Sequence, residues 1–229
     1  MIFDDKRIRI IVGHYGSGKS EFSVNYAMQL AKQNKDPNKK VAIADLDVVN
    51  PYFRSREKED FLAQIGVESF SSPLKNSTLD LPAVSAEIRK PVIDETYEYV
   101  MDVGGDDVGA RVLGSIKDIM KKSDYDMFLV INANREYTTN ADEVIRYMHS
   151  IMGASGLNIT GLINNTHLLW DTRTEDILKG EKLAKEVSEK TGIPLKYTVY
   201  PSYLDISTIK DEISSEIFTV DMIMREKWM

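Results

Sequence analysis

Residues 8–20, Ile-Arg-Ile-Ile-Val-Gly-His-Tyr-Gly-Ser-Gly-Lys-Ser, decide how the rest of the chain is interpreted. An apolar, β-branched run ends in Gly-x-x-x-x-Gly-Lys-Ser, and a helical pattern of apolar residues begins directly behind it. This order of strand, glycine-rich turn and helix start is the setting in which a phosphate-binding loop (P-loop) forms. The glycines let the backbone close around an anion, and the unpaired amides at the helix start add positive potential. The stretch therefore predicts a site for nucleotide phosphates.

We expect the whole loop and the residue behind it to contact the nucleotide. Lys19 should reach the β- and γ-phosphates and act in catalysis, and the Ser20 hydroxyl should take one position on Mg²⁺. The nucleotide-binding residues expected in this stretch are Gly13, His14, Tyr15, Gly16, Ser17, Gly18, Lys19, Ser20 and Glu21.

Composition favours a soluble globular protein. The chain has 229 residues, of which 42% are hydrophobic and 28% charged, and we expect one nucleotide-binding domain over residues 1–229. It has no cysteine, which excludes disulfides and an iron–sulfur cluster held by cysteines and is consistent with a reducing cytoplasm. No apolar run is long enough to span a membrane, and the net charge of −7 argues against nonspecific binding to nucleic acid.

Two acidic residues follow the second predicted strand. Residues 41–44 (Val-Ala-Ile-Ala) are typical of a buried parallel strand, which brings Asp45 and Asp47 to the edge where open α/β sheets bind ligands. An aspartate at this point can simply cap a turn. After a P-loop, a role for Asp47 in positioning Mg²⁺ or the attacking water is the favoured interpretation, because in-line phosphoryl transfer needs an oriented nucleophile.

A third acidic residue ends the strand predicted over residues 97–101. The sequence Asp102-Val-Gly-Gly105 is the Walker-B arrangement, in which the acid binds the magnesium shell. Its Asp-x-x-Gly spacing places the Gly105 backbone where it can bond the γ-phosphate and move away after hydrolysis.

Strand and helix patterns alternate along the whole chain. Further strands are predicted over 127–131, 159–163 and 196–200, and helices over 19–33, 108–121, 139–152 and 175–191. The spacing of Ile206, Ile209, Ile213 and Ile217 predicts a closing helix. Residues 66–96, with a short strand at 67–70 and a helix at 83–89, are interpreted as an insertion on the ligand face. The expected fold is α/β, with a doubly wound, mostly parallel sheet.

Taken together, these motifs resemble the MinD/ParA/Mrp branch of the P-loop ATPases over nearly the whole length. The run from Asp45 to Pro51 is similar to the Asp-x-Asp segment of that group, and the resemblance implies that Asp47 positions the attacking water. Asp102 matches its Mg²⁺-shell aspartate and Gly105 its γ-phosphate sensor. Residues 161–166 (Gly-Leu-Ile-Asn-Asn-Thr) resemble the strand whose final Asn recognises adenine, which implies Asn165. Tyr200 and Pro201 resemble the segment that lies against the base.

The P-loop departs from the family at one position. Many members carry a lysine after the first glycine that crosses a dimer interface to the phosphates of the partner, and this chain has His14 there. His14 either donates to a phosphate or fills the space. A homodimer is therefore expected from the resemblance, but without that lysine. Residues 218–229 do not resemble the membrane-targeting helix of MinD.

Three functions follow as hypotheses. The leading one is a cytoplasmic, Mg²⁺-dependent ATPase that binds ATP and ADP and uses hydrolysis to switch its hold on an unidentified partner protein. The second is an ATP-dependent ligase or kinase related to dethiobiotin synthetase, acting on a small molecule. The third is a GTP-dependent metallochaperone, which is disfavoured because the chain lacks an Asn-Lys-x-Asp sequence and a Cys or His cluster.

Overall fold

The computed structural model describes residues 2, 4–47, 59–71, 86–105 and 107–224. Its centre is an eight-stranded sheet in the order β3-β2-β4-β1-β5-β6-β7-β8, in which every neighbouring pair is parallel. The strands are β1 (Ile8–Gly13), β2 (Lys40–Leu46), β3 (Val67–Ser71), β4 (Tyr97–Val103), β5 (Tyr125–Ile131), β6 (Gly161–Asn164), β7 (Leu195–Pro201) and β8 (Glu216–Val220).

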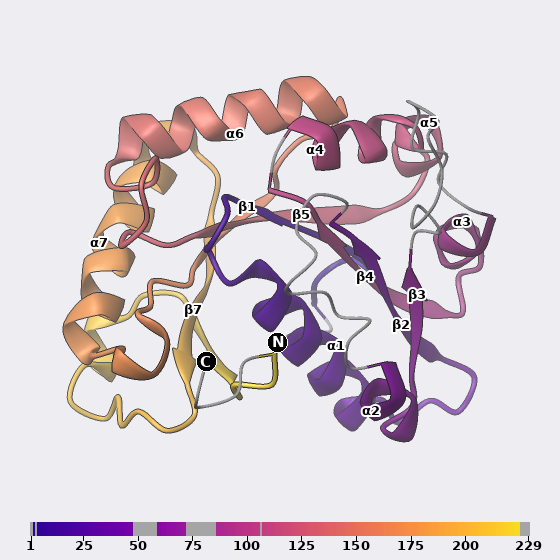
Figure 1. Ribbon diagram of the computed structural model, residues 1–229, viewed down its shortest axis with the longest axis horizontal. Helices are drawn as coiled ribbons and strands as arrows, with labels where there is room; N and C mark the ends of the chain where they lie inside the picture. The colour runs from indigo at the N-terminus through magenta and orange to yellow at the C-terminus, as the bar shows by residue number, and fades with distance from the viewer. Residues whose placement is uncertain (1, 3, 48–58, 72–85, 106, 225–229) are drawn as a thin grey trace.

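Helices cover both faces of this sheet (Figure 1). They are α1 (Lys19–Gln33), α2 (Glu59–Gln64), α3 (Ala86–Ile93), α4 (Asp107–Gly114), α5 (Lys117–Met120), α6 (Ala141–Ser155) and α7 (Thr174–Thr191), with 3-10 turns η2 (Leu169–Asp171) and η3 (Lys210–Glu212). α1 and α2 pack on one face, and α3, α4, α6 and α7 on the other. The predicted α/β fold with a doubly wound parallel sheet is confirmed. Within the described ranges, no helix is long and apolar enough to cross a membrane.

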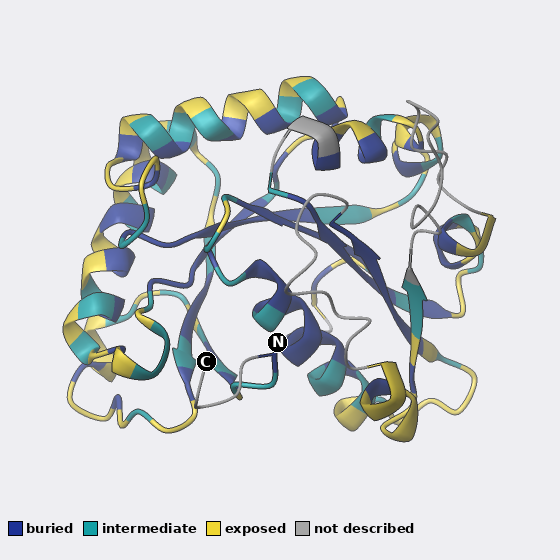
Figure 2. Cartoon of the chain, viewed as in Figure 1, coloured by how far each residue is buried: buried dark blue, intermediate teal, exposed yellow. Residues whose placement is uncertain are grey.

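The sheet is buried on both sides, which explains the continuous apolar runs of its strands. Along β1, Ile8, Ile10 and Val12 enter the core beneath the helices on one face, and Ile11 packs with Phe22 of α1 on the other. Figure 2 shows the central strands as buried and the outer surfaces of α6 and α7 as exposed. The two-sided burial holds β1 rigidly in the middle of the sheet, so the loop that follows it has a fixed base.

Most predicted elements are confirmed within a few residues, but two helices differ. The predicted closing helix is wrong, because Ile206 and Ile209 lie in a turn region that packs on Ile177 of α7, and Ile217 lies in β8. The β-branched, aromatic run of β8 fits a strand better than a helix. The helix predicted over 108–121 is interrupted between α4 and α5, where the Ser115 hydroxyl donates to the Val112 carbonyl at 2.7 Å.

The region expected as an insertion contributes to the main sheet. β3 is the edge strand beside β2, and α3 contacts β3 and β4. Its described part therefore belongs to the sheet and its helical layer. Residues 72–85 lie outside the described ranges, as do residues 48–58 with Asn50 and Pro51 of the Asp45–Pro51 motif.

Helix α7 packs closely on the loop after β6 through Gly180. A Cβ at this position would overlap the side chains of Asn164 and Thr166. We therefore expect Gly180→Ala to lower the free energy of unfolding by about 2 kcal/mol or more, as overpacking does in a tight contact. The measurement is urea denaturation followed by circular dichroism.

Gly153 in α6 is the matched control for this substitution. A Cβ there meets no atom within 4 Å, so Gly153→Ala should stabilise the protein by about 0.5–1 kcal/mol. Equal urea midpoints of unfolding for the two variants would show that the packing of α7 does not depend on the close approach at Gly180.

Candidate functional site

The loop between β1 and α1 has the backbone that the sequence predicts for a P-loop. Gly16 and Gly18 adopt φ values of 77° and 78°, which L side chains rarely take. The Ser17 amide donates to the His14 carbonyl at 3.0 Å and closes the turn. Gly18 directly precedes α1, so the first amides of the helix point toward the loop.

The loop after β4 lies against the P-loop. A Cβ at Gly105 would overlap the Gly13 carbonyl oxygen and approach the Tyr15 amide to 3.1 Å. The Gly105 carbonyl also accepts a hydrogen bond from the Tyr147 hydroxyl at 2.9 Å. Position 105 therefore has room for glycine only. The absence of a side chain there lets the end of β4 lie directly against the P-loop.

Lys19, Asp47, Asp102 and Ser20 gather at the carboxyl ends of β1, β2 and β4. The Lys19 Nζ lies 3.1 Å from Asp47 Oδ2, and both side chains are buried. Asp102 is completely buried, and Ser23 Oγ donates to its Oδ1 at 3.3 Å. Burial raises the pKa of Asp102 to about 6, while the Lys19 ammonium and the Ser20 hydroxyl oppose that rise. We refer to these four residues as the acidic cluster.

The acidic cluster fits Mg²⁺ better than a metal that needs a full protein cage. Asp102 Oδ2 is buried and has no hydrogen-bond partner among the described residues, so a carboxylate oxygen is available beside the Ser20 hydroxyl. Among the described residues, no group of three or more His, Cys, Asp or Glu side chains is placed to hold a metal ion. Mg²⁺ is commonly bound by one or two protein oxygens, water and substrate phosphates, which matches this donor set.

The two aspartates at the end of β2 have different surroundings. Asp45 Oδ1 accepts the Asp47 amide at 3.1 Å, the side-chain-to-backbone bond of an Asx turn. Asp47 directs its own carboxylate to Lys19. Asp45 thus shapes the turn that ends β2, and this turn brings the Asp47 carboxylate to Lys19 of the P-loop.

The P-loop is also tied to the loops that follow β5 and β6. Asn132, which is fully buried, donates through Nδ2 to the carbonyls of Gly16 at 3.2 Å and His167 at 3.3 Å. Asn165 Nδ2 donates to the Ser17 carbonyl at 2.8 Å, and Arg135 Nε donates to Gly16 at 3.3 Å. Sequence reasoning missed Asn132 and Arg135, although a polar residue directly after a central buried strand is the signal that points to them.

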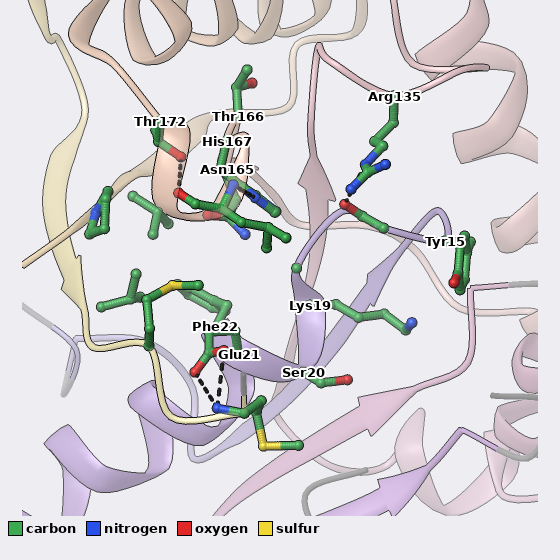
Figure 3. Close-up of a pocket in the computed structure, with 18 residues that line it drawn as sticks. Tyr15, Lys19, Ser20, Glu21, Phe22, Arg135, Asn165, Thr166, His167 and Thr172 are labelled. Carbon is green, nitrogen blue, oxygen red and sulfur yellow. Dashed lines mark hydrogen bonds between the residues drawn. The ribbon is translucent and has the colours of Figure 1, made fainter. Parts of the chain in front are cut away.

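A cavity of about 290 Å³ runs along the P-loop and the start of α1 (Figure 3). Near the loop it is lined by Tyr15, Gly16, Lys19, Ser20 and Arg135. Its other end is mainly apolar and is lined by Phe22, Leu169, Val199, Pro201, Val220, Met222 and Met224. The cavity therefore combines a cationic, amide-rich end with an apolar end, which is the shape of a site for a phosphorylated aromatic ligand.

The loop after β6 forms one wall of this cavity through Asn165, Thr166 and His167. The Leu169 amide donates to His167 Nδ1 at 3.2 Å, so the neutral imidazole carries its proton on Nε2. A Cβ at Gly18 would lie 2.8 Å from that Nε2, which places the ring against the start of α1. Sequence reasoning did not assign His167 to a site, because the three histidines are scattered along the chain.

Several residues expected at the nucleotide do not line the cavity. Tyr200 packs instead against Ile177, Ile206 and Ile209, because alternation along β7 directs it away from the face that Val199 and Pro201 share. The structure therefore places Tyr200 away from the cavity, and its contact with the base stays a prediction.

His14 packs between the rings of Tyr137 and Tyr147, with centroid distances of 5.5 and 5.4 Å. It does not line the cavity, so the structure places it where it fills space. Glu21 lines the cavity, but its carboxylate accepts the backbone amides of Ile223 and Met224. The side chain of Glu21 is thus engaged by protein rather than presented to a phosphate.

Comparison with known proteins finds similarity in fold and not in sequence. No protein-family model matches the chain, and no curated protein matches its sequence. Among solved structures, the cell division protein FtsY from Thermotoga maritima superposes with a TM-score of 0.55 and 18% identity, over 82% of this chain and 60% of that chain. The signal recognition particle 54 kDa protein from Aeropyrum pernix K1, in complex with GDP, has a TM-score of 0.50 and 22% identity over 82% and 40%. FlhF complexed with GMPPNP and Mg²⁺ has a TM-score of 0.50 and 13% identity over 83% and 64%.

The chain spans less than two thirds of the length of each of these proteins. At such low identity the likeness shows the fold, an α/β P-loop nucleotide hydrolase fold. The structures named above are not members of the MinD/ParA/Mrp branch, so membership of that branch is not confirmed.

Proposed function

We propose that this protein binds Mg·ATP and hydrolyses it slowly, using the change from ATP to ADP to switch its hold on a partner protein. The observation that supports the proposal most directly is the acidic cluster beside a cavity that continues from the P-loop to an apolar end. A homodimer of the MinD/ParA type is one form that the switch can take, by the resemblance of the motifs.

The residues of the chain have separate roles in this proposal. The P-loop amides and Lys19 bind the β- and γ-phosphates, and Ser20 and Asp102 hold the metal shell. Mg²⁺, when bound, neutralises charge on the phosphate oxygens. In the structure, Lys19 is paired with Asp47. The incoming phosphates compete for the Lys19 ammonium, and the Asp47 carboxylate is then available to orient the attacking water.

The lining of the apolar end favours adenine over guanine. Guanine presents N–H donors on N1 and N2, which a protein satisfies best with a carboxylate. Among the described residues that line the cavity, Glu21 carries the one carboxylate, and that group already accepts two backbone amides. Guanine nucleotides remain the competing ligands, since the 54 kDa protein of Aeropyrum pernix was solved with GDP.

A thermal-shift panel with Mg²⁺ and ATP, ADP, GTP or GDP tests the proposal. Ligand at about 100 times its Kd stabilises the native state by about 2.7 kcal/mol, which corresponds to a rise in Tm of roughly 5–10 °C for a chain of this size. We expect this rise with ATP and ADP and a much smaller one with GTP and GDP. A larger shift with guanine nucleotides would contradict the adenine assignment, and no shift with any nucleotide would contradict the nucleotide site itself.

A further inference from the structure

The chain after β8 crosses the first turn of α1, although the two lie about 200 positions apart in the sequence. Residues 221–224 (Asp-Met-Ile-Met), called the C-terminal segment below, run beside α1 in the close-up of the cavity (Figure 3). Met222 and Met224 of this segment line the apolar end of the cavity together with Val220 of β8. The segment is therefore part of the wall of the candidate nucleotide site.

Three polar side chains on one face of α1 hold this region of the chain. Glu21 Oε1 accepts the amides of Ile223 at 2.6 Å and Met224 at 3.1 Å, and Glu21 Oε2 lies 3.2 Å from the same Met224 amide. One turn later, Asn25 Nδ2 donates to the Asp221 carbonyl at 2.9 Å, and the Asp221 amide donates back to Asn25 Oδ1 at 2.8 Å. After a further turn, Gln29 Nε2 donates to the Thr219 carbonyl at 2.9 Å.

The spacing of these residues explains how one helix can fix an extended chain. Positions i, i+4 and i+8 lie on one side of an α-helix, and each of the three side chains reaches a backbone group of the chain running alongside. Hydrogen bonds to a carboxylate are stronger than neutral ones, so Glu21 contributes most to holding the segment. Asn25 is buried, which shields its paired bonds to Asp221 from water.

The Glu21 carboxylate binds the C-terminal segment and is not presented to the phosphates. The residue directly follows Lys19-Ser20, yet its carboxylate is turned to the C-terminal segment and the methionines of that segment face the cavity. Methionine side chains are flexible and polarizable and pack well on aromatic rings. Asn165 and His167 lie on the side of the cavity opposite Glu21 and Phe22 (Figure 3), so the cavity lies between two chain segments.

We propose that the C-terminal segment is the wall against which the nucleotide base packs, and that Glu21 is the positioning residue that fastens it. This inference rests on the proposed function, because it assigns the base-binding end of the same site. Glu21 then acts on the base through Met222 and Met224, and the phosphates are bound independently by the P-loop. Loss of Glu21 should lower the affinity for ligands that have a base and leave the affinity for ligands without a base unchanged.

Isothermal titration with Mg·ATP and with Mg·tripolyphosphate, which lacks the base and ribose, separates these effects. For Glu21→Ala we expect the Kd of ATP to rise about tenfold or more, because the C-terminal segment is no longer fastened and loses its contacts with the base. The Kd of tripolyphosphate should stay the same, because the Glu21 carboxylate binds the C-terminal segment and the P-loop holds the phosphates without it. The Tm of each variant without ligand reports whether it is folded.

Two further variants make the test independent of Glu21. Met224→Ser keeps the hydrogen bonds of Glu21 to the backbone and removes apolar surface from the wall. It should therefore lower the affinity for ATP and leave the affinity for tripolyphosphate unchanged. Glu189→Ala removes an exposed carboxylate from the last turn of α7, a helix that contributes no residue to the cavity lining, and should change the affinity for neither ligand.

Each outcome bears on one of the two proposals. Equal weakening of ATP and tripolyphosphate by Glu21→Ala, or no change in ATP affinity, would overturn the assignment of the wall and leave the nucleotide site in place. If the unmodified protein bound neither ATP nor tripolyphosphate, the proposed function would fail and this inference with it.

Discussion

Lys19→Met is expected to abolish the rise in Tm that ATP produces and to reduce the rate of ATP hydrolysis by about 100-fold or more. The substitution removes the ammonium proposed to bind the β- and γ-phosphates, and loss of one such preorganised charge typically costs 100–1,000-fold in rate. It also leaves the Asp47 carboxylate buried without the partner that lies 3.1 Å away. The protein without nucleotide should therefore lose about 3 kcal/mol of stability.

The double variant Lys19→Met/Asp47→Asn distinguishes these two effects. Replacing the unpaired carboxylate by an amide should restore most of the lost stability, because the buried charge is gone. Nucleotide binding should stay abolished. Lys32→Met, at the exposed far end of the same helix, is the matched control and should bind ATP normally. Retention of ATP binding by Lys19→Met would contradict the assignment of the P-loop lysine.

Asp102→Asn is expected to separate stability from activity. Burial raises the pKa of Asp102 to about 6, so at pH 7.5 its ionised form destabilises the native state without metal. The isosteric amide removes that charge, and we expect the free energy of unfolding without ligand to stay equal or to rise by up to about 2 kcal/mol. Mg²⁺-dependent hydrolysis should nevertheless fall by about 100-fold, because the carboxylate oxygen proposed to hold the metal shell is lost.

Urea denaturation without nucleotide and a titration of hydrolysis against Mg²⁺ measure the two quantities. Asp118→Asn, at an exposed position of α5, is the control and should change neither. A variant of Asp102 that unfolded more readily than the unmodified protein would show that the carboxylate is structural. Undiminished hydrolysis at low Mg²⁺ would remove Asp102 from the metal shell.

Much of the site could be predicted from local sequence because its chemistry comes in short motifs. The Gly-x-x-x-x-Gly-Lys-Ser run identified the loop, since the left-handed backbone at Gly16 and Gly18 is open to few other residues. The apolar strands ahead of Asp47 and Asp102 placed both acids at one edge of the sheet, where the structure brings them to Lys19. Parallel strands that are buried on both faces make this inference reliable.

Local sequence was insufficient where a residue has two possible faces or partners. Tyr200 and Pro201 are adjacent, and the register of β7 decides which of them faces the cavity. The spacing of Ile206 and Ile209 is compatible with a helix, but packing on Ile177 of α7 satisfied both side chains within a turn region. Glu21 resembles a phosphate-loop residue in sequence, and only the chain running beside it shows what its carboxylate binds.

By itself, the sequence determined the α/β fold, the P-loop and the carboxylates that meet Lys19. Each of these features depends on residues that are neighbours along the chain or that lie at the end of a strand. The tertiary structure alone decided the other end of the cavity. Its walls come from the loop after β6 and from residues 221–224, which reach α1 only through the order of strands in the sheet. Contacts between segments so far apart leave no local pattern, since the bonds of Glu21 and Asn25 go to backbone groups that every residue possesses.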